Sequence, residues 1–356
     1  MVFGNRVTTI TQDVIIPSVV DNVLGDNFIA FRILSNAKRW NGETLSRPIK
    51  VASSTLGGSF SGLDTHSTAT VDTRVKMSYY LKGYEMPVAI PGMEKAVNKT
   101  EAQVLDLIKV ELESSQEDAC DDLGDMFYGN GTGNSSKDFN GLGNLIDDGT
   151  VSATLGGLTR SAYTPNLDST VTASGGTFDL DKLATLTTAV SMGSSLKHRP
   201  SFFLSNETVQ DFYESLLQPT VRANYEAFGL PVMTRTSKSP VRAAELKGAM
   251  GYTSYTYRGI PWIADEKCTA QYLWAVNEGW LEWYGLKDAD LTDISLQSAG
   301  IDSIYNEAPS KNIGFQWTNF MVPINQYGIV AHIYLLGNLV QWNPRRNGVL
   351  TGIMGV

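Results

Sequence analysis

The chain has 356 residues, 42% of them hydrophobic and 18% charged, a composition that excludes a disordered polypeptide and allows a large core. Its net charge is −9, and the excess lies in residues 100–150, which carry 12 acidic and 2 basic side chains, against 8 and 11 in residues 1–99. Without a basic stripe to neutralise phosphates, this distribution does not favour a nucleic-acid reader. It favours contact between unlike parts of the chain, within or between subunits.

Targeting signals are not evident. Two cysteines, Cys120 and Cys268, are too few for a disulfide framework, and a reducing cytoplasm is the simplest setting. The N-terminal residues lack the basic start and unbroken apolar run of a signal peptide. The longest apolar stretch, 328–340, is shorter than the roughly 20 residues that span a bilayer, so we expect no membrane segment.

The first ninety residues predict an arm followed by a hairpin. Residues 1–45 show weak periodicity and are interpreted as an arm that lies on something else. From Ile49 to Ile90, two strand-like runs flank a glycine-rich stretch, which predicts a long β-hairpin. Its flexible tip contains Gly57, Gly58 and Gly62. Because a two-stranded ribbon is marginal in water, we expect the hairpin to pack against another chain.

A long helix follows the hairpin. Thr100 and Gln103 form a capping box, and the pattern predicts a helix over 101–128 that ends at Gly129. At about 1.5 Å per residue, this helix is roughly 40 Å long and acts as a spine.

One face of the predicted helix is acidic. At 100° per residue, Glu111, Asp118, Asp122 and Asp125 fall in one arc, here called the acidic stripe, and the apolar residues fill another. The stripe has three interpretations: a metal site, a solvated face, or a face that a basic partner covers. Histidine ligands are absent nearby and the spacing of a calcium-binding loop is not met, so the last two are favoured.

The rest of the chain predicts an α+β fold. A glycine- and serine-rich link (129–176) precedes a helix from Leu180 to Gly193, a strand at 201–204 and a helix from Ser205 or Asn206 to Pro219. The final third predicts strands, and 328–340 is apolar on both faces, which is typical of a central strand.

Catalytic motifs are missing from the sequence. We find no nucleophile elbow, phosphate loop, dinucleotide fingerprint or zinc-protease motif, and interpret the glycines of 129–134 as an ordinary loop. His66, His198 and His332 are better explained as structural residues than as catalytic bases. The tryptophans of the strand-like runs, Trp262, Trp274, Trp280 and Trp283, are better explained as core than as a ligand platform. We therefore expect no enzyme, no metal and no cofactor.

Three segments, in this order, carry a resemblance. They are "FYGNGTGNSSKDFNGLGNLI" (127–146), "RPSFFLSNETVQDFYESL" (199–216) and "YRGIPWIADEKC" (257–268). With the arm, hairpin and spine helix before them, they resemble the major capsid protein of tailed bacteriophages, of Hong Kong 97 type. The resemblance implies an N-terminal arm (1–45), an extended loop (46–92), a peripheral domain (93–177 and 306–356) and an axial domain (178–305).

The resemblance also implies a function. It implies a structural protein that self-assembles into pentamers and hexamers of an icosahedral shell around phage double-stranded DNA, which it contacts non-specifically. Scaffolding, portal and decoration proteins are possible partners, and the location is the virion capsid, assembled in the bacterial host cytoplasm. An encapsulin-like nanocompartment that encloses cargo protein shares the fold and is the alternative.

In that fold the extended loop lies over a neighbouring subunit, which gives the acidic stripe a basic counterpart. The expected contact residues are Arg39, Arg74, Lys76 and Lys82, within a basic excess that also includes Arg32, Lys38, Arg47 and Lys50. The glycines of the tip should make residues 56–67 mobile in separate subunits and ordered in a shell.

Overall fold

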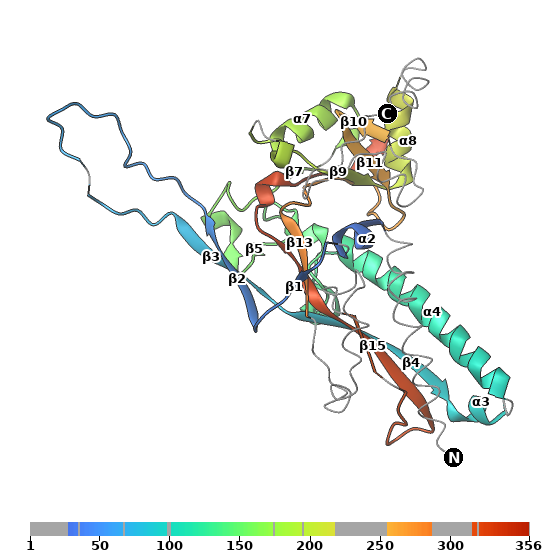
Figure 1. Cartoon of the computed structure of the whole chain (residues 1–356). Coiled ribbons are helices and arrows are strands. Elements are labelled where there is room, and N and C mark those ends of the chain that lie inside the picture. The colour runs from blue at the N-terminus through green and yellow to red at the C-terminus, as the bar shows by residue number, and fades with distance from the viewer. Residues whose placement is uncertain are drawn as a thin grey trace, which may run out of the picture.

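The structure is a computed structural model that describes residues 28–34, 36–66, 68–97, 101–173, 175–193, 196–217, 255–286, 315–318 and 320–355. Two lobes and a protruding hairpin make up this part of the chain (Figure 1). One lobe contains a long sheet and the spine helix. The other contains a second sheet with two helices beside it. The mixture of helices and strands confirms the predicted α+β class.

The long sheet is organised around β15 (Gly328–Gln341). One edge of β15 pairs with β4 (Lys82–Pro91), and the other pairs with β13 (Leu281–Gly285) and β14 (Phe315–Trp317), all antiparallel. The short β1 (Lys38–Arg39) runs parallel to β13. The prediction of a central strand at 328–340 is therefore confirmed. Burial alternates along the first half of β15, however, and only its last residues are buried on both faces.

The second sheet has the order β10-β11-β9-β12-β16-β7. Its strands are β10 (Tyr255–Tyr257), β11 (Ile260–Ala264), β9 (Phe202–Ser205), β12 (Leu273–Val276), β16 (Gly348–Leu350) and β7 (Thr170–Thr172). Helix α7 (Leu180–Val190) packs against β16, β7 and β12, and α8 (Glu207–Leu216) packs against β9. Two small sheets pair β17 (Ile353–Gly355) with β8 (Gly176–Thr177) and β5 (Thr154–Leu155) with β6 (Leu158–Thr159).

The predicted spine helix is confirmed as α4 (Glu101–Tyr128). It ends where glycine was expected to end it, because the Gly129 amide donates to the carbonyls of Asp125 and Met126 at 2.9 and 3.2 Å. The C-terminal half of α4 buries one face, which consists of Ala119, Cys120, Leu123, Phe127 and Tyr128.

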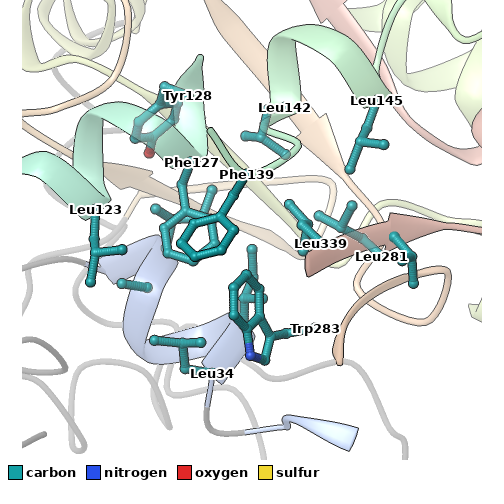
Figure 2. Packing of buried hydrophobic residues seen from close by; sticks show 14 of the residues in the cluster. Leu34, Leu123, Phe127, Tyr128, Phe139, Leu142, Leu145, Leu281, Trp283 and Leu339 are labelled. Carbon is teal, nitrogen blue, oxygen red and sulfur yellow. The ribbon is translucent and has the colours of Figure 1, made fainter. Parts of the chain in front are cut away.

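Figure 2 shows the core that this face enters. Trp283 of β13 is fully buried between Phe127 of α4 and Phe139, whose rings meet it edge-on with centroids 5.7 and 5.0 Å away. Gly337 of β15 lies against the indole, and a Cβ there would stand 2.5 Å from its Cζ2 atom. The strand pairing thus needs glycine at this position. Trp262, Trp274 and Trp283 are buried, which confirms the core interpretation for these three tryptophans, whereas Trp280 is half-buried and packs against the edge of the core.

The helix that follows β9 begins as predicted. Asn206 caps α8, and its side-chain oxygen accepts a hydrogen bond from the Val209 amide at 3.1 Å. Val209 and Tyr213 then bury the apolar face against the second sheet. Helix α7 begins at Leu180 as predicted and ends at Val190, before Gly193.

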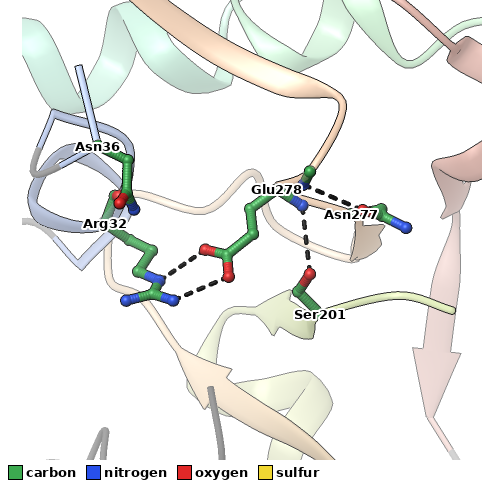
Figure 3. Close-up of polar contacts among 6 residues, drawn as sticks. Arg32, Asn36, Ser201, Asn277 and Glu278 are labelled. Atoms are coloured by element: carbon green, nitrogen blue, oxygen red, sulfur yellow. Dashed lines mark hydrogen bonds and ion pairs between the residues drawn. The ribbon is translucent and has the colours of Figure 1, made fainter. Parts of the chain in front are cut away.

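The arm prediction is wrong for residues 28–40, and residues 1–27 lie outside the described part of the chain. Helix α2 (Phe28–Leu34) buries Phe28, Ile29 and Leu34 in the chain's own core, where it packs against α4 and β13. Arg32 of α2 forms a bidentate ion pair with Glu278 at 2.7 and 2.8 Å (Figure 3). The periodicity is weak because this helix has only seven residues, so that its buried face contains only a few apolar side chains.

The expected hairpin is present but is supported by its own chain. Strand β2 (Thr44–Lys50) pairs antiparallel with β3 (Arg74–Tyr80), as the alternation predicted. Met77 and Tyr79 are buried, and the Tyr79 hydroxyl donates to the carbonyl of Gln341 at 2.7 Å. Only the segment between the two strands protrudes. The expectation that the whole ribbon needs another chain is therefore corrected.

The link between α4 and α7 is also more ordered than its glycine and serine content indicated. It contains α5 (Gly133–Ser136), α6 (Leu142–Leu145) and η1 (Arg160–Ala162). Arg160 is 1% exposed, and its guanidinium donates to five carbonyls, those of Asn144, Leu145, Asp147, Ser152 and Leu167. Burial lowers the pKa of Arg160, and nearby Asp147 opposes that shift.

Both sheets combine strands from both expected domains. Strand β13 comes from the expected axial range and joins the long sheet, whereas β16 comes from the expected peripheral range and joins the second sheet. Strand β4 comes from the expected extended loop and pairs along its whole length with β15. The exact domain boundaries stay predictions. The remaining short elements are α3 (Gly92–Val97), η2 (Leu196–His198) and η6 (Pro344–Arg346).

The Arg160 cluster gives a stability prediction. Replacing Arg160→Lys should lower the free energy of unfolding by roughly 3 kcal/mol, because an ammonium group has too few donors for five buried carbonyls. Urea denaturation measures this difference. Arg74→Lys, at an exposed position on β3, is the matched control and should stay within about 0.5 kcal/mol of wild type. Equal effects of the two substitutions would contradict the role given to Arg160.

Candidate intersubunit contact site

The acidic stripe lies on the exposed side of α4. Asp118, Asp122 and Asp125 are exposed and Glu111 is half-buried, as the helical spacing predicted. Glu117 and Asp121 are exposed on the same helix and widen the stripe. Within the described ranges, no group of three or more His, Cys, Asp or Glu side chains could hold a metal ion. The metal interpretation therefore has no ligand set there.

Two of these carboxylates have partners within the chain. The Tyr84 hydroxyl of β4 donates to Asp122 Oδ2 at 2.9 Å. Burial raises the pKa of Tyr84, and the hydrogen bond to the Asp122 carboxylate raises it further. Lys267 Nζ lies 3.0 Å from Asp121 Oδ1. The side-chain carboxylates of Asp118 and Asp125 form no hydrogen bond or ion pair with any other described residue. They are therefore the members of the stripe most available to a partner.

The basic candidates divide into two kinds. The Lys82 ammonium donates to the carbonyls of Gly131 and Asp138, so it ties β4 to the loop that follows α4. Burial lowers the pKa of Lys82, and Asp138 opposes the shift. Lys82 therefore forms its contacts within its own chain. Arg74 and Lys76 of β3 are exposed, and so is Arg39 of β1.

The exposed part of the hairpin cannot reach α4 of the same chain. Figure 1 shows the hairpin extending from one side of the molecule, while α4 lies on the opposite side of the long sheet. Contact between Arg74 or Lys76 and the acidic stripe would therefore have to join two copies.

The segment between β2 and β3, residues 51–73, forms an exposed loop tip. At the root of this segment, the Val51 carbonyl accepts a hydrogen bond from the Asn166 side chain. In residues 54–66 the hydrogen bonds are local, such as that from the Ser61 amide to Asp64 Oδ2 at 2.6 Å. Gly57, Gly58 and Gly62 have open space around the position of a Cβ, and none of the three has a φ that favours glycine. Their role is therefore not to allow a strained turn.

The tip carries apolar side chains that the sequence analysis did not single out. Leu56, Phe60 and Leu63 are 40%, 70% and 100% exposed. His66 meets the Phe60 ring edge-on, with ring centroids 4.8 Å apart. The sequence did contain a signal for this surface, namely apolar residues interspersed with glycines in a predicted loop. Exposure of apolar side chains to water is unfavourable, so such a pattern indicates a contact surface.

The other histidines show no catalytic arrangement among the described residues. His332, which we expected inside a buried strand, is half-buried, and its Nδ1 lies 2.7 Å from Glu85 Oε1 across the β15–β4 pair. Cys120 and Cys268 are buried, and burial raises the pKa of the Cys268 thiol. No helix in the described part of the chain combines the length and the hydropathy that crossing a bilayer requires.

Comparison by sequence alone matches no protein family and no curated protein. Comparison by structure gives a clear result. The cyanophage A-1(L) capsid matches with a TM-score of 0.60 at 13% identity, over 92% of this chain and 93% of that chain. Mycobacterium phage Patience matches with a TM-score of 0.50 at 11% identity, over 99% and 88%.

A third match is the SrpI encapsulin from Synechococcus elongatus, with a TM-score of 0.50 at 13% identity, over 89% of this chain and 85% of that chain. The chain therefore has the fold of phage major capsid proteins of Hong Kong 97 type, and the predicted resemblance is confirmed at the level of fold.

The loop tip gives a prediction about dynamics. In separate subunits, amides of residues 56–66 should exchange hydrogen rapidly, because their hydrogen bonds are local and exposed. In an assembled form the same amides should exchange more slowly. Amides of β15 are the internal control and should be protected in both forms. Equal protection of residues 56–66 in both forms would show that the tip meets no neighbour.

Proposed function

We propose that the chain is a structural major capsid protein, which assembles into pentamers and hexamers of an icosahedral shell enclosing phage double-stranded DNA. The observation that carries the proposal is the match to phage capsid chains along most of the length of both partners. The chain has no catalytic role in this proposal. Scaffolding, portal and decoration proteins are its possible partners in the host cytoplasm and the virion.

Exposed apolar surface supports assembly. One such surface is the loop tip with Leu56, Phe60 and Leu63. The other, here called the sheet-end patch, lies where β4 meets the start of β15, and its exposed side chains are Met93, Met321, Val322, Ile324 and Tyr327. Monomeric proteins rarely leave contiguous apolar patches uncovered, and burial of each large side chain contributes about 1.5–3 kcal/mol. Contact with other copies would cover both surfaces.

The acidic stripe is part of the same proposal. Like charges along α4 repel one another, and basic residues of a neighbouring copy would relieve the repulsion. Each exposed ion pair contributes only about 0–1 kcal/mol, but every subunit repeats the contact. Salt screens such pairs over about 10 Å at 0.1 M ionic strength, so assembly should weaken as salt rises.

An encapsulin-like shell that encloses cargo protein is the second candidate. The observation that favours it is the match to the SrpI encapsulin over most of both chains. The two candidates differ in what the particle contains. Purified particles that protect double-stranded DNA from nuclease favour the phage capsid, whereas particles without nucleic acid that retain a specific protein favour the encapsulin.

Assembly can be tested through the loop tip. Replacing Phe60→Ser together with Leu63→Ser should reduce particle yield at least tenfold and leave the melting temperature of separate subunits unchanged, because both side chains are exposed in the single chain. Light scattering and electron microscopy measure the particles. Val151→Ser, at another exposed apolar position, is the control. A wild-type protein that stays monomeric at high concentration would refute the proposed function.

Assembly can be tested separately through the charge of α4. Replacing Asp118→Asn together with Asp125→Asn should change the salt dependence of assembly more than it changes the melting temperature. Asp122 is left intact because Tyr84 binds it. Asp211→Asn with Glu266→Gln removes two charges from exposed positions elsewhere and should leave assembly unchanged. If both double variants assemble like wild type at low salt, the stripe is a solvated face.

A further inference from the structure

A cleft of about 420 Å³ lies at the root of the hairpin, and four cationic side chains line it. Arg47 and Lys50 come from β2, whereas Arg345 and Arg346 come from the turn η6 that follows β15. No carboxylate is among the described residues that line it. Segments almost 300 residues apart in the sequence thus bring like charges to one cavity, which none of the sequence motifs indicated.

Three of the four cations of the cleft have partners within the chain. Arg345 Nη1 donates to Asn166 Oδ1 at 2.9 Å, and Arg346 Nη1 donates to the carbonyl of Met192. The Arg47 guanidinium lies over the Trp342 ring, 5.6 Å from its centroid. Burial lowers the pKa of Arg346, and the neighbouring charge of Arg345 lowers it further. The repulsion between these groups would be relieved by an anion.

The cleft also has apolar walls. Trp280, Trp342, Ile49 and Met192 contribute to its lining. A phosphate backbone would match the charges but would gain little from these walls. An acidic protein surface with aliphatic groups beside its carboxylates matches both features.

The same chain offers such a surface on α4. The carboxylates of four acids in the described part of the helix form no ion pair or hydrogen bond with other described residues, namely those of Glu111, Glu117, Asp118 and Asp125. Val110, 60% exposed, lies beside them. Asp118 and Asp125 are two helical turns apart, about 10 Å, a spacing that several cations around one cleft can engage together.

We infer that the cleft at the root of the hairpin binds the acidic face of α4 from a second copy of this chain. This inference rests on the proposed function and deepens it, because it replaces a general basic excess by one cavity with named residues. Strand β2, which lines the cleft, and α4 lie on different sides of the long sheet (Figure 1), so the contact would join neighbours and repeat around a capsomer.

A charge exchange tests the contact. The cleft variant replaces Arg47→Glu and Lys50→Glu, and the helix variant replaces Asp118→Lys and Asp125→Lys. All four positions are exposed. Each variant alone should lower particle yield at least tenfold in low salt. The fourfold variant, which carries both changes in one chain, should restore yield to within about twofold of wild type.

Carbodiimide coupling of wild-type particles supplies a second measurement that needs no folded variant. This reagent joins an amine to a carboxylate in direct contact with loss of water. In particles assembled from mixed light and heavy-isotope subunits, it should link Lys50 to Asp118 or Asp125 across isotope labels. If every linked pair of residues carried the same isotope label, the docking would be overturned, because the contact would then lie within one chain.

Other outcomes separate this inference from the proposed function. If wild type assembles but the fourfold variant is no better than either double variant, the docking is wrong and the shell proposal stands. The same holds if the cleft variant assembles normally but loses affinity for double-stranded DNA, which would make phosphate the ligand. A wild type that never assembles overturns both proposals.

Discussion

The structure depends on the pairing of β15 with strands from distant parts of the chain. β4 lies about 240 residues before it and covers one edge, while β13 and β14 cover the other. The close approach of Gly337 to Trp283 allows α4 and α2 to close over the sheet. Strand β4 connects the hairpin to α3, which precedes α4 in the sequence. Its pairing with β15 therefore fixes where the hairpin and the helices leave the long sheet.

This arrangement divides the apolar and charged side chains into two groups. The apolar side chains around Trp283 are buried within the chain itself, and Arg160 donates hydrogen bonds to the buried carbonyls of the link. The loop tip, the sheet-end patch, the root cleft and the acidic face of α4 remain exposed or like-charged. In the proposed function, contact between copies would cover these surfaces, and their position on different sides of one molecule suits a ring or a shell.

Local signals in the sequence predicted local structure well. The 3.6-residue period and Gly129 predicted α4, and alternation predicted β3, because both depend on near neighbours. The expected capping box includes Thr100, which lies outside the described residues. Long-range contacts could not be predicted in this way. Lys82 and Lys76 look alike in the sequence, yet only Lys82 meets the carbonyls of Gly131 and Asp138. Likewise, η6 and β2 lie almost 300 residues apart, so the cleft was invisible. The order of degenerate motifs predicted the fold, although no single motif identifies it.

In the proposed assembly, copies of the chain bury the surfaces that its own core leaves exposed. A cryo-electron microscopy map of the assembled protein, at a resolution that shows side chains, tests this most directly. The account predicts Phe60, Leu63 and Ile324 covered by neighbouring subunits, and the exposed face of α4 against the root of another hairpin. A shell in which these side chains and this helix face open solvent would contradict it.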